Sequence, residues 1–77
     1  MGGVALSISY NKLWHLLVDK QLTKTELRNL VGVSTNIIAK LGRNESVSMD
    51  TLAKICVALE CDIADIVEIS NGKEVQV

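Results

Sequence analysis

Proline is absent from this chain of 77 residues, and glycine occurs only five times. With 48% hydrophobic and 22% charged residues, the composition excludes a disordered linker and predicts a chain that folds around a core. The length is below the roughly 100–150 residues of an ordinary domain. We therefore expect residues 1–77 to form a single domain.

Long apolar runs are also missing. The longest uninterrupted run is Ile55 to Leu59, whereas a membrane span needs about 18 or more apolar residues. The first residues lack the charged region and the long apolar core of a signal peptide. We expect a cytoplasmic protein that has no membrane partner.

Cysteine and histidine are too scarce for most site chemistry. Two cysteines, Cys56 and Cys61, cannot supply a disulfide scaffold, and on one helix they would lie about 8 Å apart, too far to bridge. His15, the single histidine, lies far upstream of both. We predict reduced core cysteines, no metal site, no cofactor and, for want of a base or nucleophile pair, no catalysis.

An excess of positive charge, as expected for a nucleic-acid binder, is missing from the total. Eight Lys and Arg against nine Asp and Glu give −1. The distribution differs from the total: residues 10–44 carry six positive and two negative side chains, and residues 45–77 carry two positive and seven negative. Such asymmetry suits a protein with one face toward phosphates, although the modest basic excess predicts weak non-specific DNA affinity.

A capping box marks the start of one short helix. In Thr23-Lys24-Thr25-Glu26 the side chains of Thr23 and Glu26 can each bond the backbone amide of the other, which predicts a helix from Lys24. The helix is expected to end at Gly32, because glycine adopts the left-handed backbone without strain. Its inward-facing side chains are expected to be Leu27, Leu30 and Val31.

Apolar residues at helical spacing predict four more helices. The first runs from Tyr10 to Lys20 after a Ser9 cap and places Tyr10 and Trp14 in the core. The others are one capped by Ser34 and running to about Leu41, one capped by Ser48 with Met49, Leu52, Ala53, Ile55, Cys56 and Leu59 at the helical period, and a short one over residues 63–67 capped by Asp62.

Alternating apolar residues predict short strands at both ends. One alternation runs from Val4 to Tyr10, and another, from Val67 to Val77, surrounds the hairpin signal Asn71-Gly72. Matching Ile69 with Val75 requires an odd-numbered loop. These strands can pair within one chain, or they can pair between two copies and form a dimer.

Two short helices joined by a glycine-centred turn are the pattern of a helix-turn-helix. The stretch from Lys24 to Leu41 resembles the Cro and lambda-repressor type (XRE family) helix-turn-helix, and residues 47–59 are similar to this family's next helix. The resemblance covers residues 10–67, which leaves 1–9 and 68–77 as terminal extensions. It implies an all-α, five-helix, lambda-repressor-like DNA-binding domain with short terminal β-strands.

The resemblance also implies which residues contact DNA. The helix after the turn would lie in the major groove, with Ser34, Thr35 and Asn36 at base edges. Lys40 would reach a base or a phosphate, and Arg43 and Asn44 would contact the DNA backbone. The alternative is that Ser34 is only a helix cap and that the others form a solvated surface.

Two positions depart from the family pattern. Lys24 replaces a glutamine that braces the DNA backbone and the recognition helix; the lysine can still contact a phosphate. Arg28 replaces a small alanine where the two helices cross. Either the helices separate slightly there, or the Arg28 stem extends outward with its guanidinium at the surface.

We predict a sequence-specific transcriptional regulator of bacterial or phage type, a repressor that binds double-stranded DNA as a homodimer on an inverted repeat. No small-molecule effector is evident. The alternative is an antitoxin-like or adaptor module on the same fold, with the acidic half or the apolar ends as the binding surface.

Overall fold

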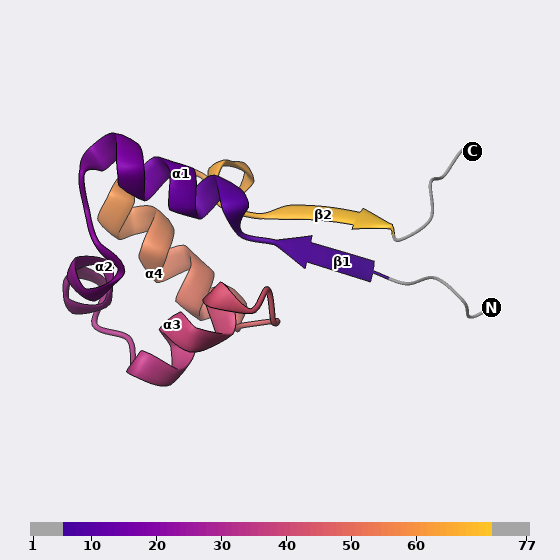
Figure 1. The fold of residues 1–77 in the computed structure, drawn as a ribbon, viewed down its shortest axis with the longest axis horizontal. Coiled ribbons are helices and arrows are strands. Elements are labelled where there is room, and N and C mark those ends of the chain that lie inside the picture. The colour runs from indigo at the N-terminus through magenta and orange to yellow at the C-terminus, as the bar shows by residue number, and fades with distance from the viewer. Residues whose placement is uncertain (1–5, 72–77) are drawn as a thin grey trace.

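A computed structural model describes residues 6–71, which form four α-helices, one 3₁₀ turn and a two-stranded sheet (Figure 1). The prediction of five helices is wrong, since the fifth is only the 3₁₀ turn. The elements in chain order are β1 (Leu6–Ser9), α1 (Asn11–Lys20), α2 (Lys24–Val31), α3 (Thr35–Gly42), α4 (Met49–Leu59), the 3₁₀ turn η1 (Ile63–Asp65) and β2 (Glu68–Asn71).

Side-chain caps start three of the helices as predicted. Thr23 Oγ1 accepts from the Glu26 amide at 3.0 Å, and the Thr23 amide donates to Glu26 Oε1 at 2.8 Å, so the capping box before α2 is complete. Ser34 Oγ accepts from the amide of Ile37 before α3, and Ser48 Oγ accepts from that of Thr51 before α4. Each cap satisfies an amide that has no partner within its helix.

Helix α1 begins one residue later than predicted. Tyr10 is not its first helical residue but occupies the cap position. Ser9 Oγ accepts from the Asn11 amide at 3.2 Å. The prediction of a Ser9 cap is therefore wrong, since Tyr10 holds the cap position without a side-chain cap bond, and Ser9, one residue earlier, bonds only the first helical amide.

One apolar core unites both halves of the chain. The predicted placement of Tyr10 in the core is confirmed, since only 1% of its surface is exposed; Trp14 packs against the core from a half-buried position. The prediction that Leu30 and Met49 face inward is wrong, since they are 55% and 68% exposed. The buried core residues are Tyr10, Leu13, Leu17, Leu27, Leu41, Leu52, Ile55, Leu59 and Ile66.

The segment predicted as the fifth helix makes only one tight turn. The Asp62 amide donates to Asp65 Oδ2 at 2.9 Å, so a capping interaction is present. Regular structure nevertheless covers only Ile63–Asp65, after which Ile66 is buried and the chain becomes extended. Because Ile66 is buried in the core and β2 begins at Glu68, the segment between Asp62 and β2 is too short for a longer helix.

The two strands form an antiparallel pair within one chain. The register places Ile8 opposite Ile69 and Ser9 opposite Glu68. This pair projects from the helical body (Figure 1). The part of the predicted hairpin after Asn71, including the pairing of Ile69 with Val75, lies outside the described residues.

The helices form two layers in the view of Figure 1, where α4 lies behind α1, α2 and α3. Helices α2 and α3 are joined at Gly32, whose φ of +81° is the left-handed conformation that glycine was predicted to supply. Across the part of the chain that the structure describes, none of the helices has both the length and the apolar character needed to cross a bilayer.

Candidate nucleic-acid interface

The first turn of α3 presents short polar side chains to solvent. The turn after Gly32 directs the chain into the Ser34 cap, and Ser34, Thr35 and Asn36 are all exposed. The Ser34 hydroxyl accepts from the Ile37 amide. Its hydrogen remains a donor, while the Asn36 amide offers both a donor and an acceptor at the exposed end of the helix.

Arg28 connects the two helices of the motif. Its Nη1 donates to Thr35 Oγ1 at 3.0 Å, and its Nη2 donates to Asn29 Oδ1 at 3.3 Å. Arg28 is half-buried, and both hydrogen bonds of its guanidinium lie at the surface. The structure therefore favours the second of the two arrangements expected for an arginine at this position. The link to Thr35 has no local signal in the sequence.

Lys24 is held over an aromatic ring. Its Nζ lies 4.4 Å from the centre of the Trp14 ring, a cation–π contact between the starts of α2 and α1. A Cβ added at Gly42 would lie 4.0 Å from the same Nζ, so the lysine also reaches the last turn of α3. Lys24, on α2, thus lies close to both α1 and α3. The side chain of a glutamine at this position would be shorter.

The loop after α3 holds Arg43 in an ion pair. Its Nε donates to Glu45 Oε2 at 2.7 Å, on the surface. The hydrogen bond and the charge of Glu45 raise the pKa of Arg43, and the hydrogen bond from Arg43 is the main cause that lowers the pKa of Glu45. The sequence analysis did not anticipate this partner, which neutralises one of the predicted phosphate-binding cations.

Asn44 fixes the same loop to the start of α1. Its Oδ1 accepts from the Tyr10 amide at 3.1 Å, and the Tyr10 hydroxyl donates to the Glu45 carbonyl oxygen at 2.8 Å. Burial raises the pKa of Tyr10. Asn44 has a φ of +58°, a conformation that asparagine tolerates better than most residues. The side-chain oxygen therefore has a structural partner 34 residues away.

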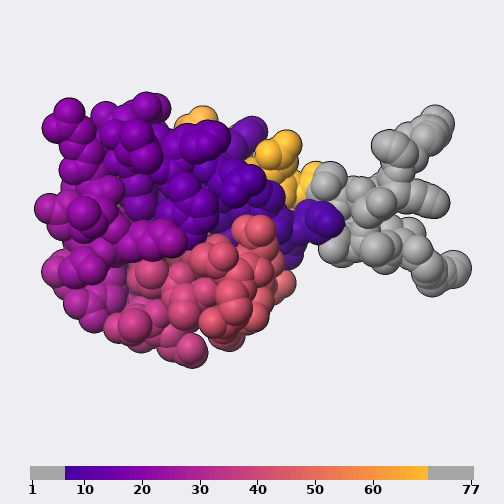
Figure 2. Space-filling model, viewed as in Figure 1, coloured from indigo at the N-terminus to yellow at the C-terminus, as the bar shows by residue number. Residues whose placement is uncertain are grey.

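Three of the eight predicted contact residues surround one hollow. A shallow hollow of about 210 Å³ is lined by Lys24, Thr25, Arg28, Thr35 and Ile38. Figure 2 shows α1, α2, α3 and the following loop forming one face, on which hardly any of α4 is visible. Half-buried Lys40 comes from the last turn of α3. The surface offers cationic donors around an exposed helix start, an arrangement suited to a phosphate backbone and base edges.

The fold and this surface define a helix-turn-helix DNA-binding domain, and the family comparison identifies its type. Residues 12–71 match the Cro/C1-type HTH DNA-binding domain. The chain belongs to this family.

Two relatives are regulators of transcription. The chain is 34% identical over 61 residues to the uncharacterized HTH-type transcriptional regulator YozG of Bacillus subtilis (strain 168), an alignment that covers 77% of this chain and 73% of that protein. It is 48% identical to the transcriptional regulator VanUg in a crystal structure, with a TM-score of 0.86 over 92% of this chain and 95% of the other. The chain is a transcriptional regulator with a helix-turn-helix DNA-binding domain.

Proposed function

We propose that the protein represses transcription by binding an inverted repeat as a homodimer, with α3 in the major groove. The observation that carries the proposal is the Arg28–Thr35 bond of 3.0 Å, which joins α2 to the exposed start of α3. The first turn of a recognition helix reads the bases, so it needs a fixed position relative to the side chains that contact the DNA backbone. Repression requires only occupancy of the operator, which such a surface supplies.

Each predicted contact has a role in this proposal. Thr35 and Asn36 contact base edges, with Asn36 bonding adenine through both ends of its amide. Lys24 and Arg28 neutralise phosphates, Lys40 reaches a base or a phosphate, and the Ser34 hydroxyl donates to a base edge. Arg43 contacts the DNA backbone once it is released from Glu45. Asn44, in the same loop, contacts the DNA backbone through its side-chain amide nitrogen, because its Oδ1 bonds Tyr10.

The dimer follows from the small size of one motif. A single helix-turn-helix contacts few base pairs, so useful specificity needs two copies on half-sites about 34 Å apart. Among residues 6–71 each strand of the terminal sheet has one neighbour, so each leaves an edge to which a second copy can pair.

Selection of bound duplexes from a random pool, at two salt concentrations, tests the proposal. An inverted repeat should be enriched, and a duplex carrying one half-site should bind much more weakly than the full repeat. Binding should weaken steeply with salt, because phosphate contacts release counterions. Absence of any enriched sequence at low salt would refute sequence-specific binding, and equal affinity for half-site and repeat would refute the dimer.

Asn36→Ala tests the recognition helix. It should lower the preference at one base position by about 1–3 kcal/mol while affinity for unrelated DNA stays unchanged. Asn11→Ala is the matched control, because Asn11 is exposed on α1, outside the helix-turn-helix. Binding of selected and mismatched duplexes to both variants, measured by fluorescence anisotropy, gives the comparison. An unchanged preference in Asn36→Ala would place base recognition elsewhere.

A further inference from the structure

An apolar hollow lies between α2 and α4. It has a volume of about 460 Å³, and its apolar lining comes from Leu30, Val31, Ala53, Val57 and Ala58. Leu30 is 55% exposed and Val57 is 79% exposed. A single exposed apolar side chain is common on protein surfaces. Leu30 and Val57 line the same hollow, and exposed apolar side chains that lie together indicate a binding surface.

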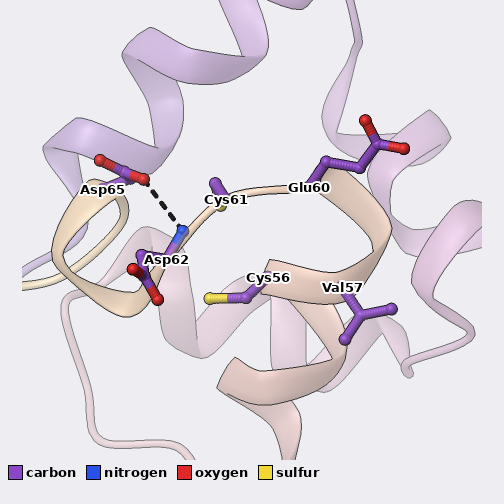
Figure 3. A pocket seen from close by; sticks show the side chains of 6 residues that line it. All are labelled: Cys56, Val57, Glu60, Cys61, Asp62 and Asp65. Carbon is purple, nitrogen blue, oxygen red and sulfur yellow. Dashed lines mark hydrogen bonds between the residues drawn. The ribbon is translucent and has the colours of Figure 1, made fainter.

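Acidic side chains continue this surface along α4. Val57 also lines a second hollow of about 540 Å³, together with Glu60, Asp62 and Asp65 (Figure 3). Figure 3 shows the Val57 and Glu60 side chains extending away from the helix end. The charged residues of the two hollows are Asp50, Lys54, Glu60, Asp62 and Asp65, a net of −3. Lys12 and Lys20, in a neighbouring hollow, form the far boundary of this acidic region.

The surface is separate from the helix-turn-helix contacts. The hollow lined by Lys24, Arg28 and Thr35 shares no lining residue with either of these two hollows. On α2, Leu30 follows Arg28 by two residues, which places the two side chains about 160° apart around the helix. A molecule bound at Leu30 and Val57 therefore leaves Arg28 accessible to DNA.

We propose that this α2–α4 face docks a basic amphipathic helix of a partner protein. The partner's apolar row would pack against Leu30 and Val57, and its lysines and arginines would face Glu60 and Asp62. Helix α4 has 11 residues, about 16 Å, so the docked helix has about three turns. A second copy of this chain fits poorly, because it would bring one net charge of −3 against another. The proposal goes beyond DNA recognition and does not depend on it.

A labelled synthetic peptide tests the proposal by fluorescence anisotropy. The probe is a helix of about 14 residues with leucines at i, i+3, i+4 and i+7 and lysines elsewhere. Two reference peptides have the same composition in scrambled order and the same leucines with glutamates in place of lysines. Saturable one-to-one binding of the amphipathic basic peptide, at least about tenfold tighter than of either reference, is expected.

Two matched variants locate the site. Val57→Ser should weaken peptide binding about tenfold, whereas Val18→Ser, which changes another exposed valine (73%) on α1, should leave it unchanged. Both should unfold at the same temperature as the parent chain, since both positions are exposed. Amide chemical-shift changes on peptide addition should fall on α4 and the end of α2.

Several outcomes would overturn the proposal. They are absence of saturable binding, equal binding of the scrambled peptide, and equal loss in the two valine variants. Self-association that disappears in Val57→Ser would assign the face to a second copy instead. Each result is independent of the selection experiment on DNA, so the docking proposal and the proposed operator binding can fail separately.

Discussion

The region around α2 and α3 and the region around α4 and η1 share one core but differ in charge and in how their surface side chains are held. Residues 10–44 carry a net +4 and residues 45–77 a net −5. In the first region Arg28 bonds Thr35, Lys24 lies over Trp14 and Arg43 bonds Glu45. In the second, apolar Met49 and Val57 are exposed, and Val57 shares a hollow with the carboxylates of Glu60, Asp62 and Asp65. The total of −1 therefore describes neither surface.

Three cations of the first region each have a side-chain partner that restricts their position. Cations that are held in place lose less conformational entropy when they meet a phosphate. The exposed side chains of α4 are instead suited to a partner that covers apolar surface. Four substitutions, three of them with a matched control, test the shared core, the α2–α3 surface and the loop that follows it.

Leu27→Ala should have the largest effect, because Leu27 is fully buried in the core that both regions share. The expected loss is about 2–5 kcal/mol in the free energy of unfolding, measured by urea denaturation. Leu30→Ala, on the exposed side of the same helix, should change it by less than about 0.5 kcal/mol. Equal losses would mean that Leu30 is also part of the core.

Arg28→Ala should weaken binding to every DNA sequence by about 1.5–3 kcal/mol, because a charged hydrogen-bond donor is lost and Thr35 loses its partner. The slope of log affinity against log salt should fall by about one contact. Lys54→Ala removes a cation from the acidic region and should leave affinity and slope unchanged. A matching loss in Lys54→Ala would contradict the separation of the two surfaces.

Gly32→Ala should destabilise the fold by about 1–2 kcal/mol, since an L side chain at a φ of +81° is strained. No atom lies within 4 Å of the added Cβ, so the cost is that of the backbone alone. Gly42→Ala, inside α3, should be neutral or stabilising by up to about 1 kcal/mol. Thermal and urea unfolding of the pair give the comparison, and equal stability of the two variants would rule out backbone strain at Gly32.

Glu45→Gln should have the smallest effect, an increase in DNA affinity of about two- to fivefold, because Arg43 is released from an exposed ion pair. Acidification should act in the same direction. The pKa of Glu45 is lowered in the fold, so the pair is intact above the ordinary carboxyl pKa and is lost as the pH falls through the lowered one. At low pH the parent chain should bind DNA as tightly as Glu45→Gln does, because the ion pair is then lost in the parent as well. Anisotropy titrations at low and neutral pH test this. Equal affinities of the two proteins at neutral pH would mean that Arg43 does not contact DNA.

Features set by neighbouring residues were predictable from the sequence. The capping box of Thr23 and Glu26, the Ser34 and Ser48 caps and the Gly32 turn each depend on a few adjacent residues, and all were confirmed. The prediction for Leu30 failed because α2 has only eight residues, and packing against α4 decides which of its apolar side chains is covered.

Long-range contacts were not predictable from local pattern. Asn44 bonds Tyr10 across 34 residues, a contact without a local signal. Pairing of the terminal strands within one chain was one of two predicted alternatives, but the register of β1 with β2 was not predicted. Of the proposed DNA contacts, the sequence supplied the residues, whereas the partners of Arg28, Lys24 and Arg43 required the three-dimensional arrangement.

The contact of Lys24 with Trp14 gives the protein its own optical reporter. Trp14 is the chain's single tryptophan, and the Lys24 ammonium lies 4.4 Å from its ring centre. Indole emission responds to a nearby charge, so movement of Lys24 toward a phosphate changes the fluorescence of the unlabelled protein. Engagement of this lysine can therefore be followed in real time without a dye, which separates its arrival on DNA from the binding of the rest of the surface.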